Sequence, residues 1–209
     1  MFPLYCIVDR DVCQARGLDP LALTDALLSG GARLLQIRDK TASSAARLAL
    51  ADALVRRCHA AGARLVVNDY CDIARLSGAD GVHVGQEDLS VEDARAILGA
   101  DAIVGVSTHD DAQVAAAARS SATYVAVGPI YGTSTKNTGY TARGLDLVRL
   151  AARSGKPVVA IGGITLDRAP DVLAAGAASV AVISDLLATG DPEARVRAYV
   201  ERLGRHPRK

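Results

Sequence analysis

The sequence lacks the features that mark several classes of protein. Its formal net charge is only +1 over 209 residues, which excludes a bulk attraction to nucleic acid or to a membrane surface. No apolar run approaches the about 20 residues that a bilayer-spanning helix needs. The chain begins Met1-Phe2-Pro3 and shows no signal-peptide pattern. No predicted strand is followed by a GxGxxG turn, which argues against a dinucleotide-binding fold.

Cysteine is scarce and shows no paired spacing. The four residues, Cys6, Cys13, Cys58 and Cys71, form no CxxC motif. A disulfide framework or a zinc site is therefore not indicated. We interpret them as reduced thiols and predict a cytoplasmic protein.

What is present suits one compact domain. Half of the residues are hydrophobic, enough to fill a sizeable core, and the length fits a single domain over residues 1–209. The chain has no linker and no low-complexity tract. Only residues 202–209 are clearly basic, which a solvated helix end explains, and we expect the tail 204–209 to be frayed.

Short apolar runs rich in Val and Ile recur along the chain without strict alternation, as expected for strands buried on both faces. They predict strands at residues 4–8, 34–37, 65–67, 81–84, 103–106, 124–127, 158–161 and 179–183. Helical patterns lie between the runs, at residues 20–29, 43–61, 71–77, 90–98, 110–119, 145–153, 167–175 and 192–203.

A strand followed by a helix, repeated eight times with short connections, indicates parallel strands joined by crossover helices. We therefore predict an α/β fold consisting of a single (β/α)8 TIM barrel. The alternative is a doubly wound open sheet. In a parallel barrel the functional site lies at the carboxyl ends of the strands, where several runs of this sequence end in polar residues.

The second run ends in Gln36-Ile37-Arg38-Asp39-Lys40. In an extended chain Gln36, Arg38 and Lys40 project to one side, whereas Ile37 and Asp39 project to the other. Three donors on one side, two of them cationic, could hold a diphosphate. The alternative is a solvated strand end with salt bridges.

Carboxylates follow the third and fourth runs. Asp69 comes directly after Asn68, and Asp88 follows the strand that contains His83. Because neighbouring strand ends meet, the two carboxylates could converge on one magnesium ion, which proteins hold through one or two carboxylates together with phosphate oxygens. Either Asp could instead cap a helix. His83 lies within its strand, where a polar contact inside the barrel is as good an interpretation as catalysis.

Two further strand ends suggest a second phosphate site. Gly162 and Gly163 follow the seventh run, and Ile183-Ser184 follows the eighth. Loops at these positions commonly bind phosphate through backbone N–H groups. The loop after the sixth run carries Thr133-Ser134-Thr135-Lys136, whose hydroxyls and ammonium suit an anion, although a simple connecting loop is the alternative. Two phosphorylated ligands in one barrel mouth are thus predicted.

These segments, in this order and at these strand ends, resemble those of the thiamine phosphate synthase family. The matching segments are Gln36-Ile37-Arg38-Asp39-Lys40, Val67-Asn68-Asp69, Asp80-Gly81-Val82-His83-Val84-Gly85-Gln86-Glu87-Asp88, Gly105-Val106-Ser107, Gly128-Pro129-Ile130-Tyr131, Thr133-Ser134-Thr135-Lys136 and Ala160-Ile161-Gly162-Gly163-Ile164. They cover nearly the whole chain, and their combination is specific although each one alone is weak.

The resemblance implies a transferase that joins a hydroxymethylpyrimidine diphosphate to a thiazole phosphate, or to its carboxylated form. It implies one Mg2+ per active site, held by Asp69 and Asp88, and catalytic roles for Arg38, Lys40, Ser107 and Lys136. The pyrimidine diphosphate would contact Gln36, Ile37, Arg38, Asp39, Lys40, Asn68, Ser107 and Lys136. The thiazole phosphate would contact Thr133, Ser134, Thr135, Gly163, Ile183 and Ser184.

Departures from the family pattern are small. Tyr131 and Gly132 stand where Phe and Pro are expected, and residues 137–143 differ from the usual loop. Two other functions stay open: a thiazole tautomerase, which needs no magnesium-diphosphate site, and a ligand-binding barrel without catalysis. We expect phosphorylated small molecules as partners, no nucleic acid or membrane, and a homodimer as one candidate assembly.

Overall fold

Eight parallel strands pair side by side in sequence order, and the first also pairs with the last, so the sheet closes into a barrel. A computed structural model describes residues 2–133 and 139–204. The strands are β1 (Leu4–Asp9), β2 (Leu34–Arg38), β3 (Arg64–Asn68), β4 (Gly81–Val84), β5 (Ile103–Thr108), β6 (Tyr124–Val127), β7 (Val158–Ile161) and β8 (Ser179–Val182).

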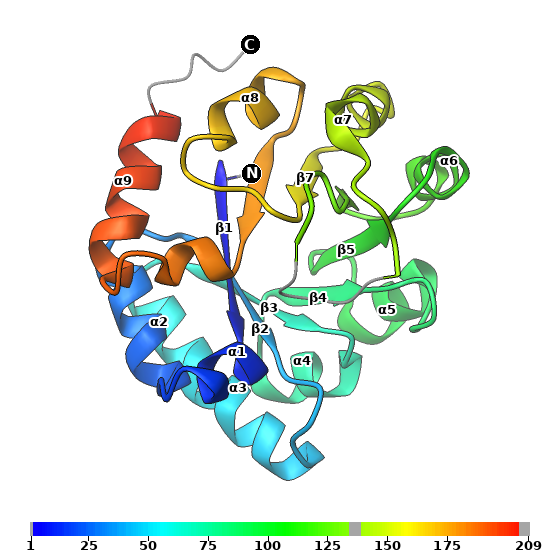
Figure 1. The fold of residues 1–209 in the computed structure, drawn as a ribbon. Helices are drawn as coiled ribbons and strands as arrows, with labels where there is room; N and C mark the ends of the chain where they lie inside the picture. The colour runs from blue at the N-terminus through cyan, green and yellow to red at the C-terminus, as the bar shows by residue number, and fades with distance from the viewer. Residues whose placement is uncertain (1, 134–138, 205–209) are drawn as a thin grey trace.

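Helices surround the barrel (Figure 1). They are α1 (Arg10–Ala15), α2 (Pro20–Ser29), α3 (Ser44–Ala60), α4 (Cys71–Ser77), α5 (Val91–Leu98), α6 (Asp111–Arg119), α7 (Gly144–Ala152), α8 (Ala169–Ala174), the 3-10 helix η1 (Ser184–Leu187) and α9 (Pro192–Gly204). Several begin at a side chain that accepts a backbone N–H. Ser90 does so for α5 and Asp110 for α6, as N-cap residues typically do.

The strands separate two apolar regions because successive side chains point to opposite faces. Leu4, Cys6 and Val8 of β1 pack outward against the helices, in the larger core. Tyr5 and Ile7 point into the barrel, where they meet residues such as Val66, Tyr124 and Val159. This inner core fills the lower part of the barrel, so the ligand-accessible part is its carboxyl-terminal mouth.

The predicted TIM barrel is confirmed. Pairing of Leu4 with Val180 joins β1 to β8, which excludes the open doubly wound sheet. All four cysteines are free and buried. Within residues 2–133 and 139–204, no helix combines the length and the apolar character needed to cross a membrane.

Two short elements were not predicted. Helix α1 has only six residues and follows β1 directly, with Asp9 accepting a hydrogen bond from Val12 N at 3.1 Å. The polar string Asp9-Arg10-Asp11 carries no helical apolar pattern, so the sequence gives no signal for it. The 3-10 helix η1 is a single turn after β8, too short for periodicity to register. The tail 205–209 lies outside the described residues.

Candidate active site

A central cavity opens at the carboxyl ends of the strands. Four of the residues that were predicted to bind the pyrimidine diphosphate line it, and they come from the three strands β2, β3 and β5: Gln36, Arg38, Asn68 and Ser107. Apolar side chains of the inner core, including Ile7 and Val159, form the remainder of its lower wall. The cavity therefore combines a largely apolar lining with a few polar groups, as small-molecule sites commonly have.

Arg38 is held at the rim of this cavity by two acidic residues, one at the end of β1 and one in α1. Its Nη1 donates to Asp9 Oδ2 at 2.7 Å and lies 3.9 Å from Asp11 Oδ2. The guanidinium is only 14% exposed. Its Nε is buried and has no hydrogen-bond partner among the described residues. Since an unpaired buried donor is costly, an anionic ligand oxygen is a natural partner for it.

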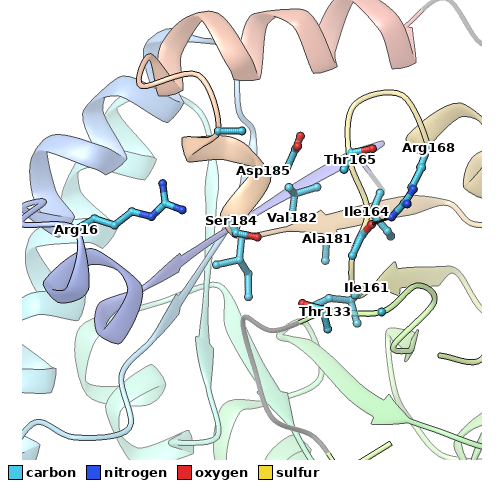
Figure 2. A pocket seen from close by; sticks show the side chains of 15 residues that line it. Arg16, Thr133, Ile161, Ile164, Thr165, Arg168, Ala181, Val182, Ser184 and Asp185 are labelled. Atoms are coloured by element: carbon cyan, nitrogen blue, oxygen red, sulfur yellow. Dashed lines mark hydrogen bonds between the residues drawn. The ribbon is translucent and has the colours of Figure 1, made fainter. Parts of the chain in front are cut away.

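A second cavity, of about 350 Å³, lies beside the ends of β7 and β8, and we call it the β7–β8 cavity. Figure 2 shows Thr133, Ser184 and Arg168 around it. Gly163 and Ile183 line it as well. The structure thus brings together all the described residues that were predicted to bind the thiazole phosphate.

Glycine is required at Gly163 for two reasons. Its φ is +62°, in the left-handed region that other residues seldom adopt. A Cβ there would also lie 2.5 Å from the carbonyl oxygen of Gly132 and 2.9 Å from Cβ of Tyr131. The backbone at this position is therefore packed directly against the loop that follows β6, and Arg168 Nη1 donates to the Gly163 carbonyl at 2.9 Å.

One carboxylate in the β7–β8 cavity is fully paired. Asp185 accepts two hydrogen bonds from Arg195 Nη2, at 3.0 and 2.8 Å, and one from the Tyr199 hydroxyl at 2.6 Å. It also accepts from the backbone N of Leu166 at 3.1 Å. Arg195 neutralises its charge, so this carboxylate need not repel an anion in the cavity. The contacts also tie the β7–α8 loop to α9.

Asp69 and Asp88 line a third cavity together with Lys40. The Asp69 carboxylate pairs with the Lys40 ammonium, and Asp88 Oδ2 accepts from Gly85 N at 2.7 Å. Burial raises the pKa of Asp69, the neighbouring Asp88 raises it further, and Lys40 opposes both effects. The two carboxylates are therefore close enough to interact, as the predicted magnesium site requires.

The backbone of Asp69 is itself unusual. Its φ is +66°, the only positive φ at a non-glycine residue in the described ranges. Such a conformation costs of order 1–3 kcal/mol and persists where surrounding contacts enforce it. Here Asp69 N donates to the His83 carbonyl at 2.8 Å. This contact with β4 helps to set where the Asp69 carboxylate lies.

The acidic pair fits a magnesium ion. Asp69 is half-buried and Asp88 is exposed. A cation stabilises two adjacent carboxylates, and Mg2+ typically takes one or two of them and completes its shell with water and phosphate oxygens. In the described part of the chain, no cluster of three or more His, Cys, Asp or Glu residues forms a closed metal site. An open site that leaves positions for substrate is the kind this arrangement could form.

Several predicted residues lie elsewhere. Ile37 packs in the outer core between strands and helices. Asp39 is buried and accepts from Arg10 Nη1 at 3.0 Å and from the backbone N of Ala42 at 2.9 Å. Both are outside the linings of the three cavities, because alternate residues of β2 face away from the barrel axis. Ser134, Thr135 and Lys136 lie outside the described residues.

Sequence reasoning missed some cavity residues. Tyr5 and Tyr124 line the central cavity from within apolar strands. An aromatic residue in such a strand is normally interpreted as part of the hydrophobic core. His109 also lines it, with Nδ1 2.7 Å from the Gly128 carbonyl and its ring stacked on Tyr140 at 4.1 Å. Its position just after the fifth strand was a usable signal. His83, by contrast, does make polar contacts inside the barrel, which was one of the two interpretations of its position.

The fold and the cavities define a (β/α)8 barrel protein with a strand-end site suited to anionic small molecules. The family model described as thiamine monophosphate synthase matches residues 4–186. The chain belongs to this family, and the resemblance seen in its motifs is confirmed.

Individual relatives agree with the family assignment. The chain is 42% identical over 205 residues to a putative thiamine-phosphate synthase of Geobacter sulfurreducens, covering 97% of this chain and 94% of that protein. It is 43% identical over 199 residues to a thiamine-phosphate synthase of Roseiflexus castenholzii, covering 95% and 86%.

Among solved structures, a thiamine phosphate pyrophosphorylase from Pyrococcus furiosus superposes with a TM-score of 0.87. It shares 28% sequence identity, and the match covers 97% of this chain and 96% of that one. The two sequence relatives are named as synthases and the solved structure as a pyrophosphorylase, so the comparisons do not favour the tautomerase or the non-catalytic barrel.

Proposed function

We propose that this protein is a thiamine phosphate synthase, a transferase that joins the pyrimidine diphosphate to the thiazole phosphate, or to its carboxylated form. The products are thiamine phosphate and diphosphate. One observation carries the proposal beyond family membership. The central cavity and the β7–β8 cavity share a wall made of Thr133, Ile161, Gly162, Ala181 and Ile183. Two ligands, one in each cavity, would therefore lie side by side.

The central cavity would hold the pyrimidine. Gln36, Asn68 and Ser107 supply polar groups around a mainly apolar base, which suits a heteroaromatic ring. Arg38 at the rim would contact the diphosphate, since its buried Nε lacks a partner. Ile37 and Asp39, which face away, would act by shaping the β2 end: Asp39 binds the backbone of the following turn.

The β7–β8 cavity would hold the thiazole phosphate. Thr133, Gly163, Ile183 and Ser184 line it, and Ser134 and Thr135 follow Thr133 in the sequence. Backbone N–H groups at glycines are well suited to phosphate because no Cβ blocks the approach. Arg168, which also lines the cavity, adds a cationic group that the sequence argument did not include.

The reaction breaks the C–O bond between the pyrimidinylmethyl carbon and the diphosphate, which leaves with the electron pair. The thiazole nitrogen then forms the new C–N bond with that carbon. Arg38, Lys40 and Lys136 would stabilise the negative charge that develops on the leaving group. Magnesium held by Asp69 and Asp88 would supply further charge neutralisation when bound. The protein's other task is to position the two substrates.

The remaining expectations accompany this proposal. They are a single domain over residues 1–209, a cytoplasmic location, one Mg2+ per active site, and phosphorylated small molecules as partners, with a homodimer as the candidate assembly. Size measurement by light scattering checks the last of these directly.

The test is an assay of purified protein with both substrates, with and without Mg2+, in which mass spectrometry identifies the product. We expect thiamine phosphate only when both substrates and the metal are present. A tautomerase would instead change the thiazole compound alone. A non-catalytic barrel would bind a substrate in calorimetry without forming product.

A further inference from the structure

A continuous chain of hydrogen bonds, buried except for its part-buried last link, crosses the barrel along the wall of the central cavity. Gln36 Nε2 donates to the Tyr5 hydroxyl at 2.9 Å, and that hydroxyl lies 3.2 Å from the Tyr124 hydroxyl. Tyr124 in turn lies 2.9 Å from His83 Nδ1, and His83 Nε2 lies 2.8 Å from Ser107 Oγ. Tyr5 and Tyr124 are 1% and 0% exposed. Only the two end residues were assigned to the pyrimidine above.

The chain takes a direction from the Gln36 amide, which is oriented with Nε2 toward the Tyr5 hydroxyl, because each hydroxyl carries one hydrogen. Among the described residues, the Tyr5 hydroxyl bonds only to Gln36 and Tyr124, and the Tyr124 hydroxyl only to Tyr5 and His83. Since Gln36 donates to Tyr5, the Tyr5 hydrogen must go to Tyr124 if it is to be used. The Tyr124 hydrogen then goes to His83 Nδ1. Any other arrangement leaves a buried hydrogen unpaired, which is costly.

This direction determines what the cavity offers at the two ends of the chain. With Nδ1 accepting, the neutral imidazole of His83 carries its hydrogen on Nε2 and donates it to Ser107 Oγ. The Ser107 hydrogen is then free to donate into the cavity. At the other end, the Gln36 amide nitrogen is engaged, so Oε1 is left as an acceptor. If the chain ran in the opposite direction, Gln36 would present its amide N–H to the cavity and Ser107 would present an acceptor.

We propose that Tyr5, Tyr124 and His83 are positioning residues that fix this direction and so make the cavity select an aminopyrimidine over an oxopyrimidine. An amino group donates to Gln36 Oε1, and a ring nitrogen accepts from Ser107. An oxopyrimidine with its hydrogen on the ring nitrogen presents the reverse pattern. Its oxygen would face Gln36 Oε1 with no hydrogen between them, and its ring nitrogen would leave the Ser107 hydrogen without an acceptor. The proposal rests on the function proposed above and concerns how that site chooses its substrate.

The surrounding structure supports a fixed chain. The register aligns His83 with Gly105 and Gly105 with Tyr124, so the three lie in one row across β4, β5 and β6. A Cβ at Gly105 would overlap the Tyr124 ring, hence glycine makes room for it. The rings of His83 and Tyr124 stack at 5.6 Å with 13° between their planes. Burial also raises the pKa of both tyrosines, which keeps their hydroxyls protonated.

The variant Tyr124→Phe tests the proposal, because it removes the central hydroxyl and keeps the ring. The Gln36 amide and the His83 ring can then each reverse independently. Calorimetry in the presence of Mg2+ would measure Kd for the aminopyrimidine diphosphate and for its 4-oxo analogue. The unmodified protein should prefer the amino compound by roughly a hundredfold, since two hydrogen bonds are mismatched in the analogue. In Tyr124→Phe the preference should fall by about tenfold or more.

Two further variants serve as an independent test and as a control. Tyr5→Phe breaks the same chain at a different link and should give the same loss, and the double variant should be little worse than either single one because the residues act as a unit. Thr108→Val is the matched control. It deletes a buried hydroxyl of β5, which donates to the Ala126 carbonyl at 2.9 Å, outside the chain, and should keep the unmodified preference.

Nitrogen-15 NMR of the His83 ring gives an independent readout. We expect the Nε2–H tautomer in the unmodified protein and a mixture in Tyr124→Phe. Observation of the Nδ1–H tautomer in the unmodified protein would overturn the proposal, as would an unchanged preference in both Phe variants. If the unmodified protein forms no thiamine phosphate, the proposed function fails. If it does so while the Phe variants keep the preference, only the positioning role fails.

Discussion

Gly163 offers a sharp test of the β7–β8 cavity, through the substitution Gly163→Ala. A non-glycine residue in the left-handed region costs about 1–2 kcal/mol of folding free energy. At Gly163 the new Cβ also meets the Gly132 carbonyl at 2.5 Å, so the loop after β6 must move. Backbone hydrogen bonds to a phosphate are worth about 1.5–3 kcal/mol each. Loss of one should therefore raise KM for the thiazole phosphate by roughly 10- to 100-fold.

The control variant Gly78→Ala separates the loss of folding free energy from the rise in KM. Gly78 has φ +69°, close to the value at Gly163, but a Cβ there has nothing within 4 Å, and it ends α4, outside the three cavities. Urea unfolding should show about 1–2 kcal/mol lost in this variant, with both KM values unchanged. Gly163→Ala should lose at least as much stability and raise KM for the thiazole phosphate well above KM for the pyrimidine. If both KM values rise equally, the assignment of the β7–β8 cavity to the thiazole phosphate is wrong.

Three further outcomes are expected. Asp69→Asn and Asp88→Asn should each abolish most Mg2+-dependent turnover with an unchanged circular dichroism spectrum, and the double variant should lose little more; full activity after metal chelation would contradict this. Lys136→Ala should lower kcat more than it weakens binding, by roughly 2–4 kcal/mol, and unchanged single-turnover diphosphate release would refute it. Burial raises the pKa of Cys13 to about 11 and that of Cys58 to about 12, so thiol-specific reagents should leave both unmodified at pH 8 until urea unfolds the chain.

The raised pKa values of Cys13 and Cys58 also predict how the free energy of unfolding changes at alkaline pH. A pKa that is higher in the folded state means that the folded protein binds the proton more tightly. Stability from Cys13 and Cys58 is thus fully present below their ordinary value near 9 and declines as the pH rises toward 11–12. Urea midpoints at pH 8 and pH 10.5 check this sign, and a Cys58→Ala variant should show a smaller decline.

The barrel could be predicted from sequence because its signals are local and repeated. Buried parallel strands are continuous apolar runs, and a helix pattern follows each. Because each apolar run marks a strand, its last residues could be assigned to a strand end, and Gln36, Arg38, Asp69 and Gly163 were placed in this way. Alternation within β2 also separated Gln36 and Arg38 from Ile37 and Asp39, and the structure shows that difference in the two sides of the strand.

What could not be predicted depends on contacts across the barrel. Tyr5 and Tyr124 are 119 residues apart in the chain, and nothing near either one marks it as part of a polar chain. The pairing of Asp185 with Arg195 depends on how α9 packs over the β8 end. The positive φ of Asp69 accompanies its backbone hydrogen bond to His83 in β4, a contact that the local sequence does not reveal. Such features follow from three-dimensional neighbours and leave little trace in local pattern.

The closure of β1 on β8 has a consequence for how the protein becomes functional during synthesis. Strand β1 is made first, yet its partner β8 comes about 175 residues later, counting from Leu4 to Ser179, and Asp185 needs Arg195 and Tyr199 from α9. Long-range pairing of this kind forms late because the intervening chain must first be ordered. An unfinished chain on the ribosome would therefore lack the closed barrel and the complete β7–β8 cavity, and we expect ligand binding there to begin only once α9 has docked.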